Sequence, residues 1–128
     1  MQNPWLENYC RNHPGDVVYG EVFGNVQSLK YGLKKGHYQI RIFDILREGK
    51  FLPYDSLFGS ADLQCVPSLG VHPFNLETLK NMAEGNSLIA DANHIREGIV
   101  VRPVVDRFTY EIGRLQLKII SNAYLEHE

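Results

Sequence analysis

The chain has 128 residues, of which 44% are hydrophobic and 22% charged, and its formal net charge is −2. This composition is typical of a soluble globular protein and excludes a disordered chain, a collagen and a coiled coil. The length lies in the range of about 100–200 residues that one domain usually takes, so we predict a single domain over residues 1–128. The near-neutral charge balance gives no sign of a strongly basic nucleic-acid-binding protein.

Neither the apolar runs nor the cysteines indicate a membrane or secreted protein. No run approaches the roughly 18 apolar residues that a membrane-spanning helix needs, and residues 1–12 lack the apolar centre of a signal peptide. Cys10 and Cys65 form no CxxC pair, which favours reduced thiols and a cytoplasmic location.

The N-terminal part of the chain predicts a short helix followed by a strand. Residues 4–12 favour a helix with a proline in its first turn, where proline is tolerated. After a turn at residues 13–16, the alternating residues 17–23 predict a strand that Gly24 closes. Residues 25–37 carry glycines and a Lys-Lys pair, and we expect them to form a loop.

The clearest strand is predicted over residues 38–46, because their apolar residues alternate. Strict alternation places one set of side chains on one face and a second set on the other: Tyr38, Ile40 and Ile42 against Gln39, Arg41 and Phe43. Residues 47–50 then predict a hairpin turn into residues 51–53.

Two further helices are expected in the middle of the chain, over residues 54–62 and 75–84. Asn75 is a competent N-cap for the second helix, and Gly85 is a favourable residue directly after its C-terminus.

Strands return in the last third of the chain, at residues 99–105. Pro103 should lie at the end or edge of this strand, because it has no N–H to donate to a neighbour. Residues 107–111 and 115–121 complete a predicted antiparallel meander. Strands interrupted by helices without regular alternation predict an α+β fold with a mostly antiparallel sheet and short helices.

Four segments place polar residues beside glycines or aliphatic strands: Gly20–Gly24, Ile42–Ile45, Arg96–Arg102 and Leu117–Ser121. Each has an ordinary structural explanation when taken alone, since a glutamate between glycines is usually a solvated turn residue and a phenylalanine in a strand usually belongs to the core. The basic residues of the last third alternate with acidic ones, so a salt-bridged surface explains them at least as well as a phosphate-binding face.

The order and spacing of these segments change that balance. As GEVFG, IFDI, REGIVVRP and LKIIS, they resemble the motifs of the ATP-dependent RNA ligases, a family of covalent nucleotidyltransferases, from about residue 18 to residue 125. The resemblance implies a partial, ATP-grasp-like adenylation domain that carries the third to fifth motifs. It also implies that the protein joins RNA 3′-hydroxyl and 5′-phosphate ends in RNA repair, using ATP and Mg²⁺.

The same resemblance implies a nucleotide-binding set of five residues. Phe43 and Val100 would clamp the adenine, and stacking on an aromatic ring is worth about 1–3 kcal/mol per base. Glu21 would accept hydrogen bonds from the ribose hydroxyls. Lys118, with support from Arg102, would contact the α-phosphate as negative charge shifts towards pyrophosphate.

Three residues are implied to take part in catalysis: Lys118, Glu97 and Asp44. Glu97 offers the hard oxygen that Mg²⁺ takes near a phosphate, and it is the expected metal ligand. Asp44 belongs to the site by resemblance, and our interpretation is that it orients a neighbouring cation or water.

The main departure from the family concerns the nucleophile. The first motif of the family, Lys-x-Asp/Asn/His-Gly, supplies the lysine that carries AMP, and it precedes the segment of Glu21. None of the twenty residues before Glu21 is a lysine, and none of the six lysines of the chain begins such a tetrapeptide, Lys34-Lys35-Gly36-His37 being the nearest. We therefore expect the C-terminal part of an adenylation domain that forms no covalent AMP adduct by itself. In the fifth motif, Ile120 stands where many relatives have a second lysine.

Three alternatives stay open at this point. The chain could be a non-catalytic module that holds nucleotide or RNA, a subunit completed by another chain that supplies the lysine, or a fragment of a capping-type guanylyltransferase that uses GTP. If strands that normally cover the sheet are missing, exposed apolar surface predicts self-association.

Overall fold

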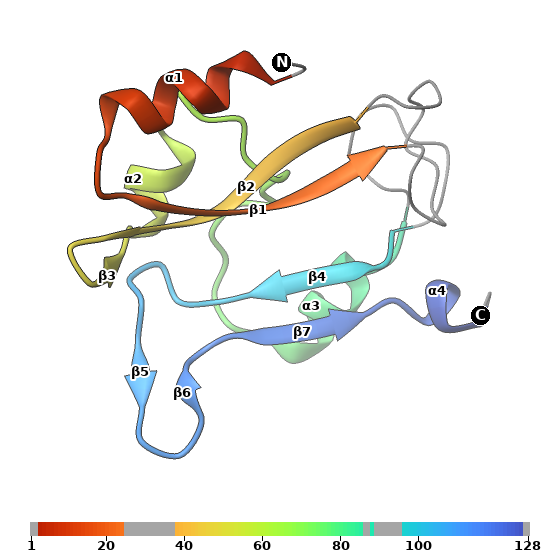
Figure 1. Cartoon of the computed structure of the whole chain (residues 1–128). Coiled ribbons are helices and arrows are strands. Elements are labelled where there is room, and N and C mark those ends of the chain that lie inside the picture. The colour runs from red at the N-terminus through yellow and green to blue at the C-terminus, as the bar shows by residue number, and fades with distance from the viewer. Residues whose placement is uncertain (1–2, 25–37, 86–87, 89–95, 127–128) are drawn as a thin grey trace.

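The computed structural model describes residues 3–24, 38–85, 88 and 96–126. These residues form four short helices and three small antiparallel sheets (Figure 1). The predicted α+β fold with mostly antiparallel strands is therefore confirmed. Within the described ranges, no helix has the length and apolar character to cross a membrane.

The N-terminal half builds a helix against a three-stranded sheet. Helix α1 (Pro4–Asn12) lies along strands β1 (Val17–Gly24) and β2 (Tyr38–Arg47), and short β3 (Lys50–Phe51) continues the sheet in the order β1-β2-β3. The predicted helix has the expected bounds, with the proline at its first position, and each predicted strand extends one residue further. The expected loop over 25–37 lies outside the described residues.

The predicted hairpin between β2 and β3 is confirmed. Arg47 pairs with Lys50, and the two residues between them have positive φ angles, 51° at Glu48 and 78° at Gly49. Two consecutive positive φ angles match the right-handed twist of the flanking strands, and glycine adopts them without steric cost.

A β-bulge interrupts the pairing of β1 with β2. Tyr19 pairs with Asp44 and Gly20 pairs with Ile42, so Phe43 has no partner on β1. The expectation of strict alternation is therefore wrong beyond Ile42, because one extra residue on a strand reverses the faces that follow it. As a result Ile42 and Ile45 both enter the core, and the side chain of Asp44 lies on the opposite face.

The hydrophobic core lies between this sheet and two helices, α1 and α2 (Tyr54–Phe58). Its buried residues are Tyr9, Ile42, Ile45, Leu57 and Leu63. Helix α2 ends four residues earlier than predicted, because the chain after it turns back to the sheet. There the backbone N–H of Ile42 donates to the carbonyl of Gln64 at 2.9 Å, and the N–H of Val66 donates to the carbonyl of Ile42 at 2.9 Å.

The C-terminal half forms a second layer. Strand β4 (Gly98–Val101) pairs antiparallel with β7 (Leu117–Ile120), and a small hairpin of β5 (Phe108–Thr109) and β6 (Gly113–Arg114) lies between them in the chain. The predicted meander is wrong, because β4 pairs across the hairpin rather than with the next strand. Pro103 follows the end of β4, as predicted.

Two helices accompany this layer, α3 (Leu76–Met82) and α4 (Asn122–Glu126). The predicted cap is confirmed, because the Asn75 side chain accepts a hydrogen bond from the Thr78 N–H at 3.0 Å. The helix ends at Met82, two residues before the predicted end. Gly85, at φ 111°, lies further on, where its carbonyl accepts from the Arg96 N–H at 2.7 Å.

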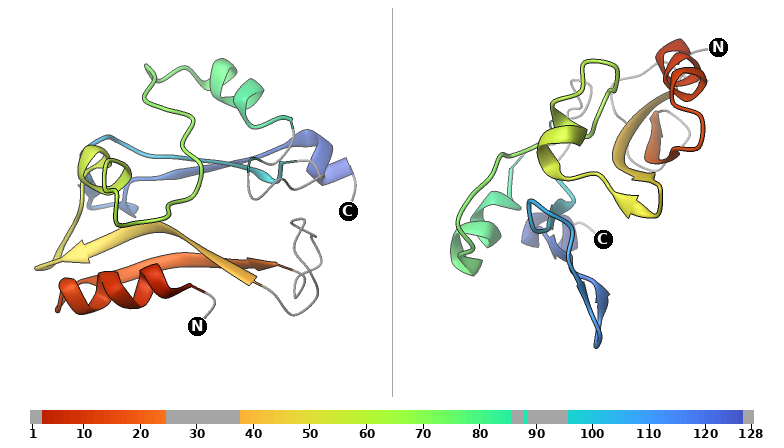
Figure 2. Two further views of the ribbon diagram at one scale, coloured as in Figure 1. Left: turned by 90° about the horizontal axis from the view of Figure 1, so that it is seen from above. Right: turned by 90° about the vertical axis from the view of Figure 1, so that its left-hand side faces the viewer.

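Seen from above, the elements follow one another from the bottom to the top of the left-hand view of Figure 2: α1, the sheet with β1 and β2, the β4–β7 pair and α3. The β5–β6 hairpin projects away from this stack in both Figure 1 and the right-hand view of Figure 2. The predicted motifs are therefore divided between two layers: GEVFG and IFDI on the first, and the other two on the second.

Candidate functional site

Three of the predicted site residues meet on the β4–β7 pair. Val100 lies directly opposite Lys118 in the register, so both side chains are on the same face. This face is open, since Val100 is 62% exposed and the Lys118 side chain 56% exposed. Glu97 joins them through an ion pair, with its Oε1 3.0 Å from Lys118 Nζ.

The backbone around Glu97 is fixed by contacts with the end of β7. The carbonyl of Glu97 accepts from the Ser121 N–H at 2.8 Å, and the buried Ser121 hydroxyl donates to the carbonyl of Arg96 at 2.6 Å. At Gly98, an added Cβ would collide with the backbone carbonyl of Ile119. The glycine of this motif is therefore required by the close approach of two strands, whatever chemistry the motif carries.

This arrangement leaves a cation and a carboxylate available at the surface. An exposed ion pair contributes only about 0–1 kcal/mol, so Lys118 can exchange its carboxylate for an anionic ligand at little cost. The described residues contain no group of three or more His, Cys, Asp or Glu that could hold a metal ion. Mg²⁺ is commonly held by one or two carboxylates together with phosphate oxygens and water, and Glu97 fits that pattern.

Asp44 lies in a different environment, between two arginines. Its carboxylate is 4% exposed and accepts two hydrogen bonds from Arg114, at 2.6 and 2.9 Å. Arg102 Nη1 lies 2.8 Å from the same carboxylate, and Arg102 Nη2 donates to the carbonyl of Phe43 at 2.6 Å. Sequence analysis placed Asp44 and Arg102 in one site, and the structure brings them into direct contact.

Arg114 is a residue of this cluster that sequence analysis did not single out. Its Nε donates to Asp106 at 2.5 Å, and its guanidinium carbon lies 3.7 Å from the centre of the Phe51 ring. The hydrogen bonds that Arg114 donates to Asp44 and Asp106 hold the pKa of Arg114 above its ordinary value. The alternation of basic and acidic residues was the available signal, and it indicated a solvated surface rather than this largely buried cluster.

Glu21 and Phe43 lie on the first layer. Glu21 is exposed and pairs across the sheet with Arg41, while Phe43 is the half-buried residue of the bulge. An added Cβ at Gly20 would lie 2.8 Å from the carbonyl of Arg41, so glycine is required there. Among the described residues, no hydrogen bond or ion pair links the side chains of Glu21 or Phe43 to Glu97 or Lys118. Their joint role around one nucleotide stays a prediction.

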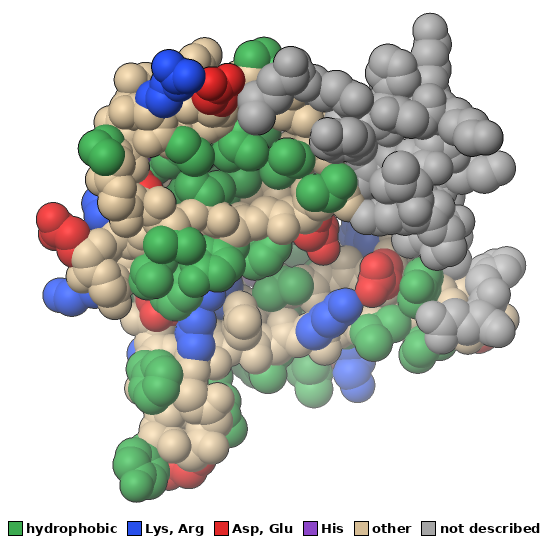
Figure 3. All heavy atoms as spheres, in the orientation of Figure 1, with side chains coloured by type: hydrophobic (Ala, Val, Ile, Leu, Met, Phe, Trp, Pro, Cys, Tyr) green, Lys and Arg blue, Asp and Glu red, His purple; other side chains and the backbone are tan. Residues whose placement is uncertain are grey.

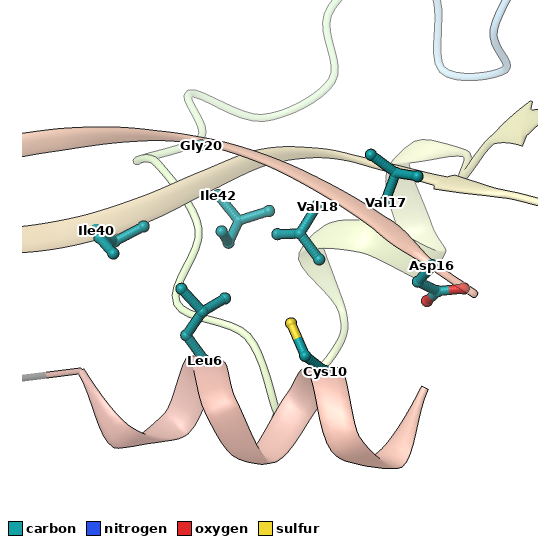
Figure 4. Close-up of a pocket in the computed structure, with 8 residues that line it drawn as sticks. All are labelled: Leu6, Cys10, Asp16, Val17, Val18, Gly20, Ile40 and Ile42. Carbon is teal, nitrogen blue, oxygen red and sulfur yellow. The ribbon is translucent and has the colours of Figure 1, made fainter. Parts of the chain in front are cut away.

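A separate hollow of about 410 Å³ lies under helix α1 (Figure 4). Leu6 and Cys10 of the helix point towards Val18, Ile40 and Ile42 of the sheet. This hollow is on the core face of β2, on the other side of the sheet from Asp44, and no predicted site residue lines it.

Comparison with known proteins gives one finding. The chain matches the model of a family described as RNA ligase over residues 3–120, which is nearly its whole length. No curated protein matches the chain, and no solved structure matches it.

Proposed function

The chain belongs to the RNA ligase family, and from this premise we propose that it binds ATP or AMP on the open face of β4–β7 and serves the joining of RNA 3′-hydroxyl and 5′-phosphate ends. The observation that carries the proposal is the pairing of Val100 with Lys118 beside Glu97. It presents an apolar surface, a cation and a carboxylate on neighbouring positions of one exposed face.

The nucleotide would be held by residues of both layers. Val100 offers an apolar contact for one side of the adenine, and Phe43 on β2 would stack on the other. Glu21, which is exposed on β1, would accept hydrogen bonds from the ribose.

The phosphates would be held by Lys118 and Mg²⁺. On binding, the α-phosphate would replace Glu97 as the partner of Lys118, and the released carboxylate would become a ligand for Mg²⁺, directly or through water. A bound Mg²⁺ would neutralise the phosphate charge. Arg102 would support the phosphate only after leaving the Phe43 carbonyl, so we expect its contribution to be smaller than that of Lys118.

The first test is nucleotide binding by the wild-type chain and by Lys118→Ala, measured by calorimetry with ATP and Mg²⁺. We expect Lys118→Ala to weaken binding by about tenfold to a hundredfold, because a hydrogen bond to a charged group contributes about 1.5–3 kcal/mol. Lys80→Ala is the matched control, since Lys80 is an exposed lysine on α3. No binding by the wild type, or equal losses in the two variants, would refute the proposal.

A second candidate function is binding without chemistry, which the absence of a Lys-x-Asp/Asn/His-Gly tetrapeptide favours. We expect incubation with α-labelled ATP to leave no labelled band after denaturing electrophoresis. A labelled band would identify an unexpected nucleophile and refute this second candidate. If a second chain supplies the lysine, adding it should restore the adduct.

We also propose that the chain self-associates, because it exposes apolar side chains at its surface. Apolar side chains lie at the edge and tip of the projecting β5–β6 hairpin, beside polar groups (Figure 3), and Phe108, Tyr110 and Ile112 are 77%, 100% and 62% exposed. Exposed apolar surface of this kind usually marks an interaction site. Sizing by light scattering should detect dimers or larger species, and a monomer at high concentration would contradict this part of the proposal.

A further inference from the structure

We infer that Arg114 is a positioning residue for the nucleotide site, because it holds the β4–β7 layer at a fixed place against the sheet that carries Phe43 and Glu21. This inference rests on the proposed function, because the proposed nucleotide site has residues on both layers and Arg114 keeps the two layers together. Arg114 itself lies outside the residues proposed to touch the nucleotide.

The buried apolar core of the first layer does not extend into the second layer. The hydrophobic core and the partly buried side chains packed against it all belong to residues 5–65. Among the described residues from 96 onwards, only Ser121 is buried. We therefore expect polar contacts to fix much of the position of the second layer relative to the first.

The charged contacts between the layers converge on one carboxylate. Arg102 directly follows the last residue of β4, and Arg114 lies three residues before the first residue of β7. These strand ends, Val101 and Leu117, are paired with each other. At this end of the β4–β7 pair, the arginine next to each strand forms an ion pair with the same carboxylate, that of Asp44 on β2.

Arg114 makes more contacts with the first layer and with Asp106 than Arg102 makes. Two of its nitrogens bind Asp44, its Nε binds Asp106, and its guanidinium covers the ring of Phe51 on β3. Its side chain is 18% exposed. Because a guanidinium offers its donors in a rigid plane, two bonds to one carboxylate fix orientation as well as distance, which a lysine cannot do.

The position of this tie connects it to the proposed site. Asp44 is the neighbour of Phe43, and Lys118 is four residues beyond Arg114. The same link therefore sets the distance between the aromatic residue on the first layer and the cation on the second. A misplacement of about 1 Å can cost a catalytic or binding site up to about a hundredfold.

The test compares Arg114→Gln and Arg114→Lys with Arg47→Gln. Arg47 is a fitting control because it also makes two hydrogen bonds to one largely buried carboxylate, Asp16, at 2.9 and 2.8 Å. That pair lies within the first layer. For each variant, ATP affinity is measured together with the distance between spin labels at native Cys10 and at Leu125→Cys, in a Cys65→Ser background.

We expect both Arg114 variants to lose about tenfold or more in ATP affinity and to broaden the distance distribution between the layers. Arg47→Gln should leave both measurements close to those of the wild type. Equal effects of Arg114→Gln and Arg47→Gln, or a narrow, unchanged distance in Arg114→Gln, would overturn the inference. If the wild type binds no ATP, the proposed function fails, and the distance measurement alone decides whether Arg114 fixes the layers.

Discussion

The two layers of this protein are stabilised in different ways. The first has a compact apolar core in which Ile45 and Leu57 are completely buried. The second contributes no described residue to that core. It is attached through charged side chains around Asp44 and through the Tyr54 N–H, which donates to the carbonyl of Val104 at 2.9 Å. Apolar burial is additive and tolerant of small shifts, whereas an ion pair between rigid groups works at one geometry. The comparison indicates that the first layer is stable by itself, whereas the placement of the second layer depends on few contacts.

The largest expected effect is that of Asp44→Ala, which removes the carboxylate shared by two arginines. Breaking one side of a buried ion pair typically costs about 3–5 kcal/mol, because the remaining charges lose their partners. We expect hydrogen exchange to accelerate first in β4 and β7 while β1 and β2 keep their protection. Simultaneous loss of protection in both layers would show that they unfold as one unit and would weaken the comparison.

Ile45, the residue after Asp44, allows the stability of the first layer to be tested instead. Ile45→Ala leaves a cavity in the first layer and should lower the free energy of unfolding by about 2–5 kcal/mol. Chemical denaturation measures this loss, and Val105→Ala serves as a control, because Val105 is 66% exposed and exposed substitutions usually change stability by less than about 0.5 kcal/mol. An equal effect of the two substitutions would contradict the assignment of the core.

The first layer should also respond to alkaline pH through Tyr9. Burial, supported by a hydrogen bond to Asp16, raises the pKa of Tyr9 to about 12. A pKa higher in the folded chain than its unfolded value of about 10 contributes stability that is present below pH 10 and lost as the pH rises towards 12. The free energy of unfolding of the wild type should therefore fall more steeply than that of Tyr9→Phe over this range. Parallel curves for the two proteins would contradict this prediction.

The smallest expected effect concerns helix α3 in the second layer. Asn75→Ala removes the side-chain acceptor of the Thr78 N–H and should cost about 1 kcal/mol. Asn75→Asp keeps an acceptor there and should retain the stability of the wild type. Thermal unfolding checks both variants, and equal melting temperatures for Asn75→Ala and the wild type would show that this cap does not stabilise the second layer.

Much of the first layer could be predicted from sequence, because its signals are local. The proline and the turn residues define α1 and the hairpin, and alternation defines most of β2. The bulge at Phe43 was missed, because one extra residue leaves no trace in composition and is detected only by pairing with β1. The pairing of β4 with β7 was also missed, since no local pattern encodes which distant strand will be the partner.

In the candidate site, too, the local motifs could be predicted from sequence and the contacts between distant residues could not. The motifs predicted Glu97, Val100 and Lys118 as members of one site, and the register of β4 with β7 brings them together. Asp44 was also selected from its motif, but its arginine partners could not be predicted. Arg114 is seventy residues away in the chain, and only the fold shows that its charge is used inside the protein.

The single unpaired residue in β2 has a consequence for how this strand tolerates change. Removing Phe43 would make Gly20 with Ile42 and Tyr19 with Asp44 consecutive pairs of a regular ladder, so the Asp44 carboxylate would still face the two guanidinium groups and Ile45 would still face the core. Such a deletion would remove the local bend and extra twist that a bulge gives a strand. The unpaired residue is therefore what allows β2 to carry one additional side chain without turning a carboxylate into the core.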